Sequence, residues 1–352
     1  MNLRGIAAAV AVIALVAAIY NPSTGLAQEE LKTVTLRVIT DPVGDDYGPG
    51  TYKYPTNEAF TNGSLDLTKF ELLRYEEGNT TKYIGFRFTF SSLGENYLNT
   101  TYGWSVQAIQ AYVTVVSAGV GRMDTFGLNA VIRPVDAWQF AVIVEPYNAT
   151  NTTSLNPLRG PVPPSLIFEN GTIVTANITT VVNTTANYIE VRIPAEYLKN
   201  YLSYIAAWRF VVAVSGFDPN APGGIMQVRA SSGESVIGGA PADALNAFVA
   251  PKIMDLLNPE NGTQEQILGS YLASTGEPAV LAAYPAATDM DYPKPPETVT
   301  VTTTATYIST TTKTVTTSTV QAVEYFGPST YALAVLLIIL LGVLAYVLKK
   351  GR

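Results

Sequence analysis

The sequence predicts an all-β, antiparallel β-sandwich with a few short helices. Apolar and polar residues alternate along residues 83–90, 138–145 and 208–215, as they do in strands that bury one face. No long helical period separates the extended runs, which end at Gly, Pro and Asn turns. Cys is absent, so the fold has to be held by its core without disulfides. Four further extended runs lie at 33–39, 104–116, 172–182 and 188–193.

The first 28 residues predict a secretory signal. Arg4 precedes an apolar run over residues 6–20, and a polar stretch leads to a small-residue region ending at residue 28. The alternative is an uncleaved N-terminal anchor, although the run is short for a membrane span. Residues 29–290 then form the ectodomain.

The other end predicts a membrane anchor. Residues 326–348 carry no charge and are long enough to cross a bilayer core of about 30 Å. The basic tail at 349–352 belongs inside, which makes this a single-pass protein of the cell membrane, with its ectodomain outside and its C-terminus in the cytoplasm.

Residues 291–325 are rich in Pro and Thr. This composition is typical of glycosylated stalks that hold a domain away from a membrane. Such Thr/Val segments before a terminal anchor resemble those in surface proteins of thermophilic archaea. The alternative is a β-strand, because Thr and Val both favour extended backbone.

Two features of the body are predicted in more detail. Trp138 and Trp208 lie on the apolar phase of their strands, which assigns both to the core. The best helix candidate begins at Thr263, where Thr263 and Gln266 have the spacing of a capping box.

Composition excludes several classes of function. The 352 residues contain no His and no Cys, which excludes a Ser-His-Asp triad, the usual zinc sites, iron–sulfur clusters and His-ligated haem. Outside the signal and the tail, 17 cations face 28 anions, so nucleic acid is an improbable partner and acidic polysaccharides are disfavoured. With no nucleophile–base or acid pair visible, we expect no enzymatic activity.

Nine Asn-x-Ser/Thr sequons predict glycosylation of an exposed surface. The cluster between residues 148 and 183 indicates exposed loops, and a glycan-covered face is a poor binding face. The nine positions are Asn62, Asn79, Asn99, Asn148, Asn151, Asn170, Asn177, Asn183 and Asn261.

An acidic loop follows the first extended run. Asp41, Asp45 and Asp46 lie within six residues on a Gly- and Pro-bent segment, and Asp66 follows after a further short stretch. Carboxylate oxygens are the ligands of Ca²⁺, and a cation would relieve their repulsion. The alternative is that these Asp residues serve Asx-turns and hairpin caps, because the spacing does not match an EF-hand.

The same loop carries a family resemblance. The stretch DPVGDDYGPGTYKYP at 41–55, with Ser64 to Phe70, resembles the opening of the C-terminal domain of glucodextranases and some pullulanases, a DOMON-like module related to family 9 carbohydrate-binding modules. Supporting matches occur at 104–107, 121–124, 137–138, 193–198 and 253–268, so the resemblance covers about residues 33 to 287.

The resemblance implies a β-sandwich used for carbohydrate or cell-surface attachment, without catalysis. The glucodextranase module is joined to a catalytic domain, whereas the remainder of this sequence is assigned to signal, stalk and anchor. The sequon-rich stretch at 148–183 also departs from the pattern. Haem-binding DOMON relatives use Met and His, and His is absent here.

Sugar sites present aromatic faces, which makes Tyr47, Tyr52 and Trp104 the candidate ligand-binding residues. Exposed Tyr in turns without any ligand is the alternative. We therefore expect a non-catalytic cell-surface module that binds α-glucan or envelope glycan. A structural surface-layer anchor or spacer, acting through protein contacts, is the second hypothesis.

Overall fold

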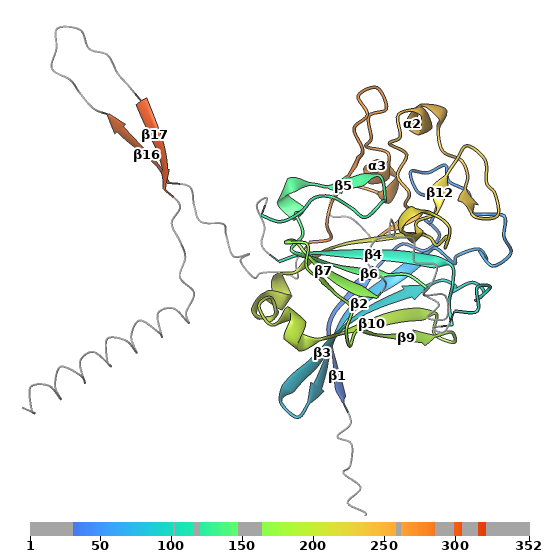
Figure 1. Cartoon of the computed structure of the whole chain (residues 1–352), viewed down its shortest axis with the longest axis horizontal. Helices are drawn as coiled ribbons and strands as arrows, with labels where there is room; N and C mark the ends of the chain where they lie inside the picture. The colour runs from blue at the N-terminus through green and yellow to red at the C-terminus, as the bar shows by residue number, and fades with distance from the viewer. Residues whose placement is uncertain are drawn as a thin grey trace, which may run out of the picture.

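The computed structural model describes residues 31–100, 103–115, 120–146, 164–257, 262–285, 299–304 and 316–321. Two antiparallel sheets face each other at the centre of the body (Figure 1). The first sheet has the order β1-β2-β3-β10-β9 and the second the order β14-β11-β4-β6-β7-β8.

The elements have the following bounds. The first sheet consists of β1 (Lys32–Thr40), β2 (Leu67–Glu77), β3 (Thr80–Phe90), β10 (Tyr188–Pro194) and β9 (Thr179–Asn183). The second consists of β14 (Asp255–Leu256), β11 (Arg209–Gly216), β4 (Gln107–Thr114), β6 (Phe140–Val144), β7 (Ser165–Phe168) and β8 (Ile173–Val174). Two short parallel pairs join β12 (Gln227–Val228) to β13 (Val236–Ile237) and β15 (Ala279–Leu281) to β5 (Ala130–Ile132). The α-helices are α2 (Ala242–Asn246) and α3 (Gln264–Leu268), and four 3-10 turns lie at Pro134–Asp136, Ala195–Leu198, Leu202–Ala207 and Pro222–Gly224.

The main core lies between the two sheets. Phe70 of the first sheet packs against Phe210 of the second, with ring centroids 5.0 Å apart. Phe86 of the first sheet packs against Trp208, which directly precedes β11, with ring centroids 6.5 Å apart. All four side chains are fully buried. The antiparallel sandwich is confirmed, and so is the assignment of Trp208 to the core.

The central strands of the second sheet are buried on both faces, which corrects the expectation of half-buried strands. Every residue of β4, β6 and β11 is buried. The face turned away from the first sheet is covered by an outer layer, by which we mean the long connections that carry β5, β15 and α3 (Figure 1). Trp138 belongs to this second core, with Tyr112 and Leu281. Alternate residues of a strand face opposite sides of the sheet, and here both sides contact an apolar core.

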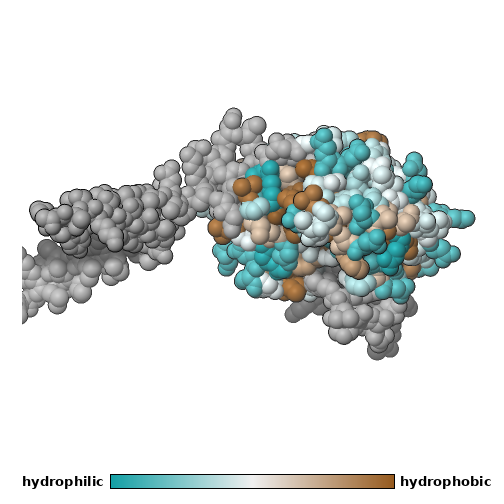
Figure 2. Space-filling view, turned by 90° about the horizontal axis from the view of Figure 1, so that it is seen from above, coloured by the Kyte–Doolittle hydropathy of each residue, from teal (hydrophilic) through white to brown (hydrophobic). Residues whose placement is uncertain are grey.

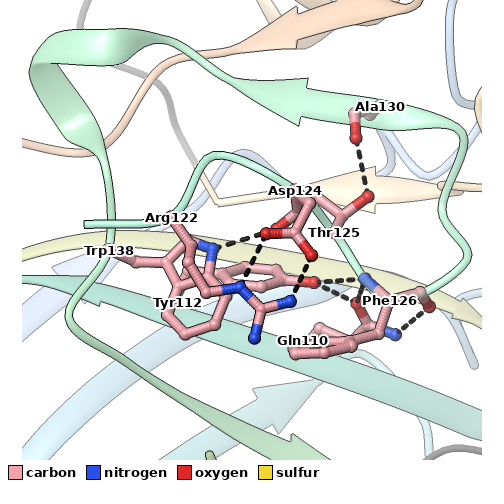
Figure 3. Close-up of polar contacts among 8 residues, drawn as sticks. All are labelled: Gln110, Tyr112, Arg122, Asp124, Thr125, Phe126, Ala130 and Trp138. Atoms are coloured by element: carbon pink, nitrogen blue, oxygen red, sulfur yellow. Dashed lines mark hydrogen bonds and ion pairs between the residues drawn. The ribbon is translucent and has the colours of Figure 1, made fainter. Parts of the chain in front are cut away.

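A polar network attaches the loop at 121–127 to the outer face of the second sheet (Figure 3). Arg122 forms a two-pronged ion pair with Asp124, at 2.9 and 2.5 Å, and lies 4.8 Å from the centre of the Trp138 ring. The Trp138 indole donates to the Asp124 carbonyl at 2.9 Å, and the Tyr112 hydroxyl accepts from the Phe126 amide at 2.9 Å. The loop is therefore fixed by packing and hydrogen bonds together.

A second network lies on the outward face of the first sheet, centred on Glu190 of β10. Its buried carboxylate accepts from Tyr75 Oη at 2.5 Å, from Arg87 Nε at 2.8 Å and from Arg192 Nε at 2.6 Å. These hydrogen bonds outweigh burial, which alone would raise the pKa of Glu190, and hold that pKa below its usual value. The group links β2, β3 and β10.

The C-terminal end of the body is attached to the sandwich at several points. Tyr284 exchanges backbone hydrogen bonds with Phe210 of β11, at 2.7 and 3.3 Å. Arg37 of β1 donates to the carbonyls of Trp208 and Pro285, and its guanidinium lies 5.1 Å from the centre of the Tyr284 ring. The last described residues of the body are therefore held by both sheets.

The remaining sequence predictions have mixed outcomes. The helix at Thr263 is confirmed as α3, with the capping box to Gln266 present. Within 291–325, β16 (Val299–Thr304) pairs with β17 (Thr316–Gln321) as an antiparallel hairpin, and the stalk stays a prediction. The predicted signal, residues 1–28, and the predicted span and tail, residues 326–352, lie outside the described residues. Among the residues that are described, no helix is long and apolar enough to cross a membrane.

Candidate metal centre

Three carboxylates converge at one end of the sandwich. We call this group, Asp45, Asp66 and Asp255, the acidic corner. One oxygen from each lies within 4.8 Å of the others. Asp45 lies in the loop after β1, Asp66 directly precedes β2, and Asp255 begins β14. The acidic corner thus lies where β1 and β2 of the first sheet approach the edge strand of the second.

Backbone and side-chain donors orient Asp66 and Asp255. The Gly44 amide donates to both Asp66 oxygens, at 3.1 and 3.0 Å, and Ser91 Oγ donates to Oδ2 at 2.5 Å. The Leu67 amide donates to Asp255 Oδ2 at 2.5 Å. Donors from the first sheet and its loops thus orient both carboxylates, including Asp255 of the second sheet.

The loop that carries Asp45 is held from the opposite side by Gln264 of α3. Gln264 Nε2 donates to the Asp45 carbonyl, while its Oε1 accepts from the Leu256 amide at 2.5 Å. The Gly48 amide donates to the Met254 carbonyl at 2.8 Å. The buried amide of Gln264 therefore links the loop to β14.

The acidic corner holds more negative charge than the surrounding donors compensate. Asp255 Oδ1 and Asp45 Oδ1 are buried and accept no hydrogen bond, and Asp255 is 0% exposed. Burial, then Asp41, Asp45 and Asp66, raise the pKa of Asp255 well above its usual value. Burial, with smaller contributions from Asp66 and Asp46, raises the pKa of Asp45 to about 6. Buried charge without a partner is costly, so this arrangement calls for a counterion or a proton.

The geometry fits a calcium ion. Ca²⁺ binds oxygen ligands at about 2.3–2.6 Å, so two ligands on opposite sides of the ion are about 4.6–5.2 Å apart. The three oxygens of the acidic corner fall inside this limit, and all of them belong to carboxylates. Neither His nor Cys is available to favour a softer metal.

Only two of the four Asp residues that the sequence singled out belong to the acidic corner. Asp45 and Asp66 meet as expected. Asp46 is buried but accepts from the Tyr54 hydroxyl, which itself accepts from the Leu65 amide at 2.9 Å, so Asp46 serves the turn. Asp41 is buried, and its charge contributes to the raised pKa of Asp255.

Asp255 is the residue that sequence reasoning about the loop missed. It follows the loop by about two hundred positions, and its neighbours Met254 and Leu256 are apolar. A single carboxylate within an otherwise buried run was the available signal, because such a residue is rare without a partner.

Two of the three predicted sugar-stacking aromatics are wrong. Trp104 is 1% exposed and Tyr52 is 5% exposed, so neither presents a ring face to a ligand. Tyr52 instead packs in the main core and donates to the Pro251 carbonyl at 2.8 Å. Tyr47 is 42% exposed and stays a candidate.

Five of the six described sequons are exposed. These are Asn62, Asn79, Asn99, Asn170 and Asn177, whereas Asn183 is partly buried at the end of β9. Asn148, Asn151 and Asn261 lie outside the described residues. Glycosylation requires an accessible Asn side chain, and these six positions are accessible to differing degrees. Their glycosylation stays a prediction.

Comparison with known proteins matches one family. The family model described as the C-terminal binding module, SLH-like, of glucodextranase matches residues 36–283. The match runs from β1 to the end of the outer layer and contains the whole acidic corner. No curated protein matches the chain.

Proposed function

Because this chain belongs to the family of SLH-like C-terminal binding modules of glucodextranase, we propose that residues 29–290 bind a polysaccharide at the cell surface without catalysing a reaction. The observation that carries this proposal is the extent of the match, which takes in both sheets and the outer layer. A binding module acts by presenting a fixed surface, and a core buried on both sides of its central sheet supports such rigidity.

The proposal includes the setting of the module. The apolar residues 326–348 would anchor the chain, with the basic tail inside and the body outside. Residues 291–325 would act as a Thr-rich, glycosylated spacer. Glycans on the exposed sequons would leave binding to faces without them.

Calcium is the proposed cofactor. In this proposal Asp45, Asp66 and Asp255 hold the ion, and Asp41 adds charge nearby. The ion would fasten the loop after β1 to the edge of the second sheet. Its role is structural, because binding free energy for the folded form adds to stability.

The test is retention of the full chain, kept in mild detergent, on an insoluble α-glucan and on cell-envelope polysaccharide. Columns are run with calcium, after chelation, and after calcium is restored. We expect specific retention on at least one glycan, with chelation weakening it through the loop after β1. Absence of retention on every glycan in calcium would refute the polysaccharide role and favour a surface-layer spacer that acts through protein contacts.

A further inference from the structure

A cavity of about 200 Å³ opens between the β12 strand, helix α2 and the segment that leads to β14. Its wall includes the polar side chains of Asn129, Gln227, Arg229 and Lys252, with Phe248 at its edge. Pockets for drug-sized ligands are typically about 300–1,000 Å³, so this one suits a single sugar ring. Figure 1 shows α2 and β12 beside each other above the sheets, and Figure 2, seen from above, shows apolar residues in separate patches between polar ones.

Phe248 occupies a backbone position that favours glycine. Helix α2 ends in a Schellman arrangement, in which the Val249 amide donates to the Ala244 carbonyl at 3.0 Å and the Phe248 amide donates to the Leu245 carbonyl at 3.2 Å. Phe248 has a φ of 59° in this turn. Among the described residues, every other residue with positive φ is Gly or Asn.

The Phe248 side chain gains nothing from the fold to offset this strain. It is 85% exposed, so its ring contributes little to the core. Gly or Asn would satisfy the same turn without the steric cost of a bulky side chain. A residue that is strained in the backbone and exposed in the side chain, at the edge of a cavity, is best explained by contact with a ligand.

The cavity is cationic in an acidic protein. Arg229 is exposed and Lys252 is partly buried, and neither forms an ion pair within the part of the chain that the structure describes. Burial, and then the charge of Arg229, lower the pKa of Lys252, so the two cations lie close enough to repel each other. Two adjacent cations without an acid beside them favour an anion.

We propose that this cavity binds one carboxylate-bearing sugar residue of the polysaccharide. Arg229 and Lys252 would hold the carboxylate, Phe248 would lie against the ring face, and the Gln227 amide would bond to hydroxyl groups. This inference rests on the proposed function. It also revises the expectation that acidic polysaccharides are disfavoured. That expectation rests on the excess of 28 anions over 17 cations outside the signal and the tail, whereas recognition depends on charges within a Debye length of about 8 Å.

The test compares retention of the full chain on three polysaccharides: a neutral glucan, a polyuronate and a sulfated glycan. The variants are Phe248→Gly, Lys252→Met and Arg229→Met, with Lys199→Met as the matched control on a distant exposed lysine. Free glucuronate and glucose serve as soluble probes in thermal unfolding. We expect the wild type to prefer the polyuronate, each cavity variant to weaken that binding at least tenfold, and Lys199→Met to change nothing.

Phe248→Gly separates ligand contact from folding. Relief of the positive φ should raise the unfolding temperature of this variant while retention falls, a combination that damage to the fold would not produce. Unchanged retention of Phe248→Gly, or equal wild-type binding to neutral glucan, would overturn the inference and leave the proposed function standing. Preference for the sulfated glycan would replace the carboxylate with a sulfate as the recognised group, and so would also overturn it. Failure of the wild type to bind any glycan would overturn both.

Discussion

Replacement of Asp255 by Asn should have opposite effects on stability with and without calcium. In the metal-free protein the change removes a buried charge, while the new amide still accepts from the Leu67 amide, as Asp255 Oδ2 does at 2.5 Å. Its NH₂ group would lie in the acidic corner, where the buried Asp45 Oδ1 accepts no hydrogen bond now. In calcium the same change removes one of three charged ligands.

The magnitude follows from the geometry of the acidic corner. Two carboxylates no more than 4.8 Å apart repel by about 3.5 kcal/mol at an effective dielectric constant of about 20. The raised pKa of Asp255 means that a proton relieves part of this repulsion. We therefore expect Asp255→Asn to raise the metal-free free energy of unfolding by about 1–3 kcal/mol, or roughly 2–4 °C per kcal/mol for a domain of this size.

In calcium the wild type should be the more stable of the two proteins. A site filled at one hundred times its dissociation constant stabilises the native state by about 2.7 kcal/mol, and the variant should lose most of that gain. Thermal unfolding followed by circular dichroism, with chelator and with calcium, measures both arms. Glu196→Gln, on an exposed side chain, is the control for loss of one negative charge. If the wild type is the more stable form in chelator, or if both proteins respond equally to calcium, the reasoning fails.

Three further predictions concern the core and the outward face of the first sheet. Glu190→Gln should lower the free energy of unfolding by about 2–4 kcal/mol, because Arg87 and Arg192 lose charge-assisted hydrogen bonds; a change below about 0.5 kcal/mol in urea unfolding would contradict this. The folded-state pKa of Glu190 lies below its unfolded value, so its contribution is complete above about pH 4.5 and is lost as pH falls through the folded pKa; the gap between wild type and Glu190→Gln should therefore narrow at pH 3. Trp104→Ala should cost about 3–5 kcal/mol, while the folded fraction keeps its glycan retention, since a buried ring contacts no ligand; loss of retention by folded protein would reinstate Trp104 at the binding site.

Strand periodicity was predictable along several long strands whose pairing is regular. Along β3, Phe86, Phe88 and Phe90 alternate in sequence and are all buried in the structure. The neighbouring strand β2 was missed, because its register shifts between Leu67 and Lys69 and again near Tyr75. Each shift interrupts the two-residue period, so the sequence shows no continuous alternation.

The candidate site was predictable only in part. Asp45 and Asp66 could be paired because both lie on the connection between the first two strands. Asp255 joins them through the packing of the two sheets, which no local spacing encodes. Phe248 was missed for another reason. It stands out through its positive φ and its exposed side chain, and the residue type alone predicts neither.

The attachment of Tyr284 and Pro285 has a mechanical consequence. If the chain is tethered through the residues that follow, a pull on the tether arrives first at the backbone hydrogen bonds between Tyr284 and Phe210, and at the carbonyl that Arg37 holds. Since β11 lies inside its sheet, between β14 and β4, the load would spread to strands on both sides of it. The parallel pair of β15 and β5 lies next along the chain and would be loaded along its length. A tether at this end would thus load strands of both sheets, through Phe210 of β11 and Arg37 of β1.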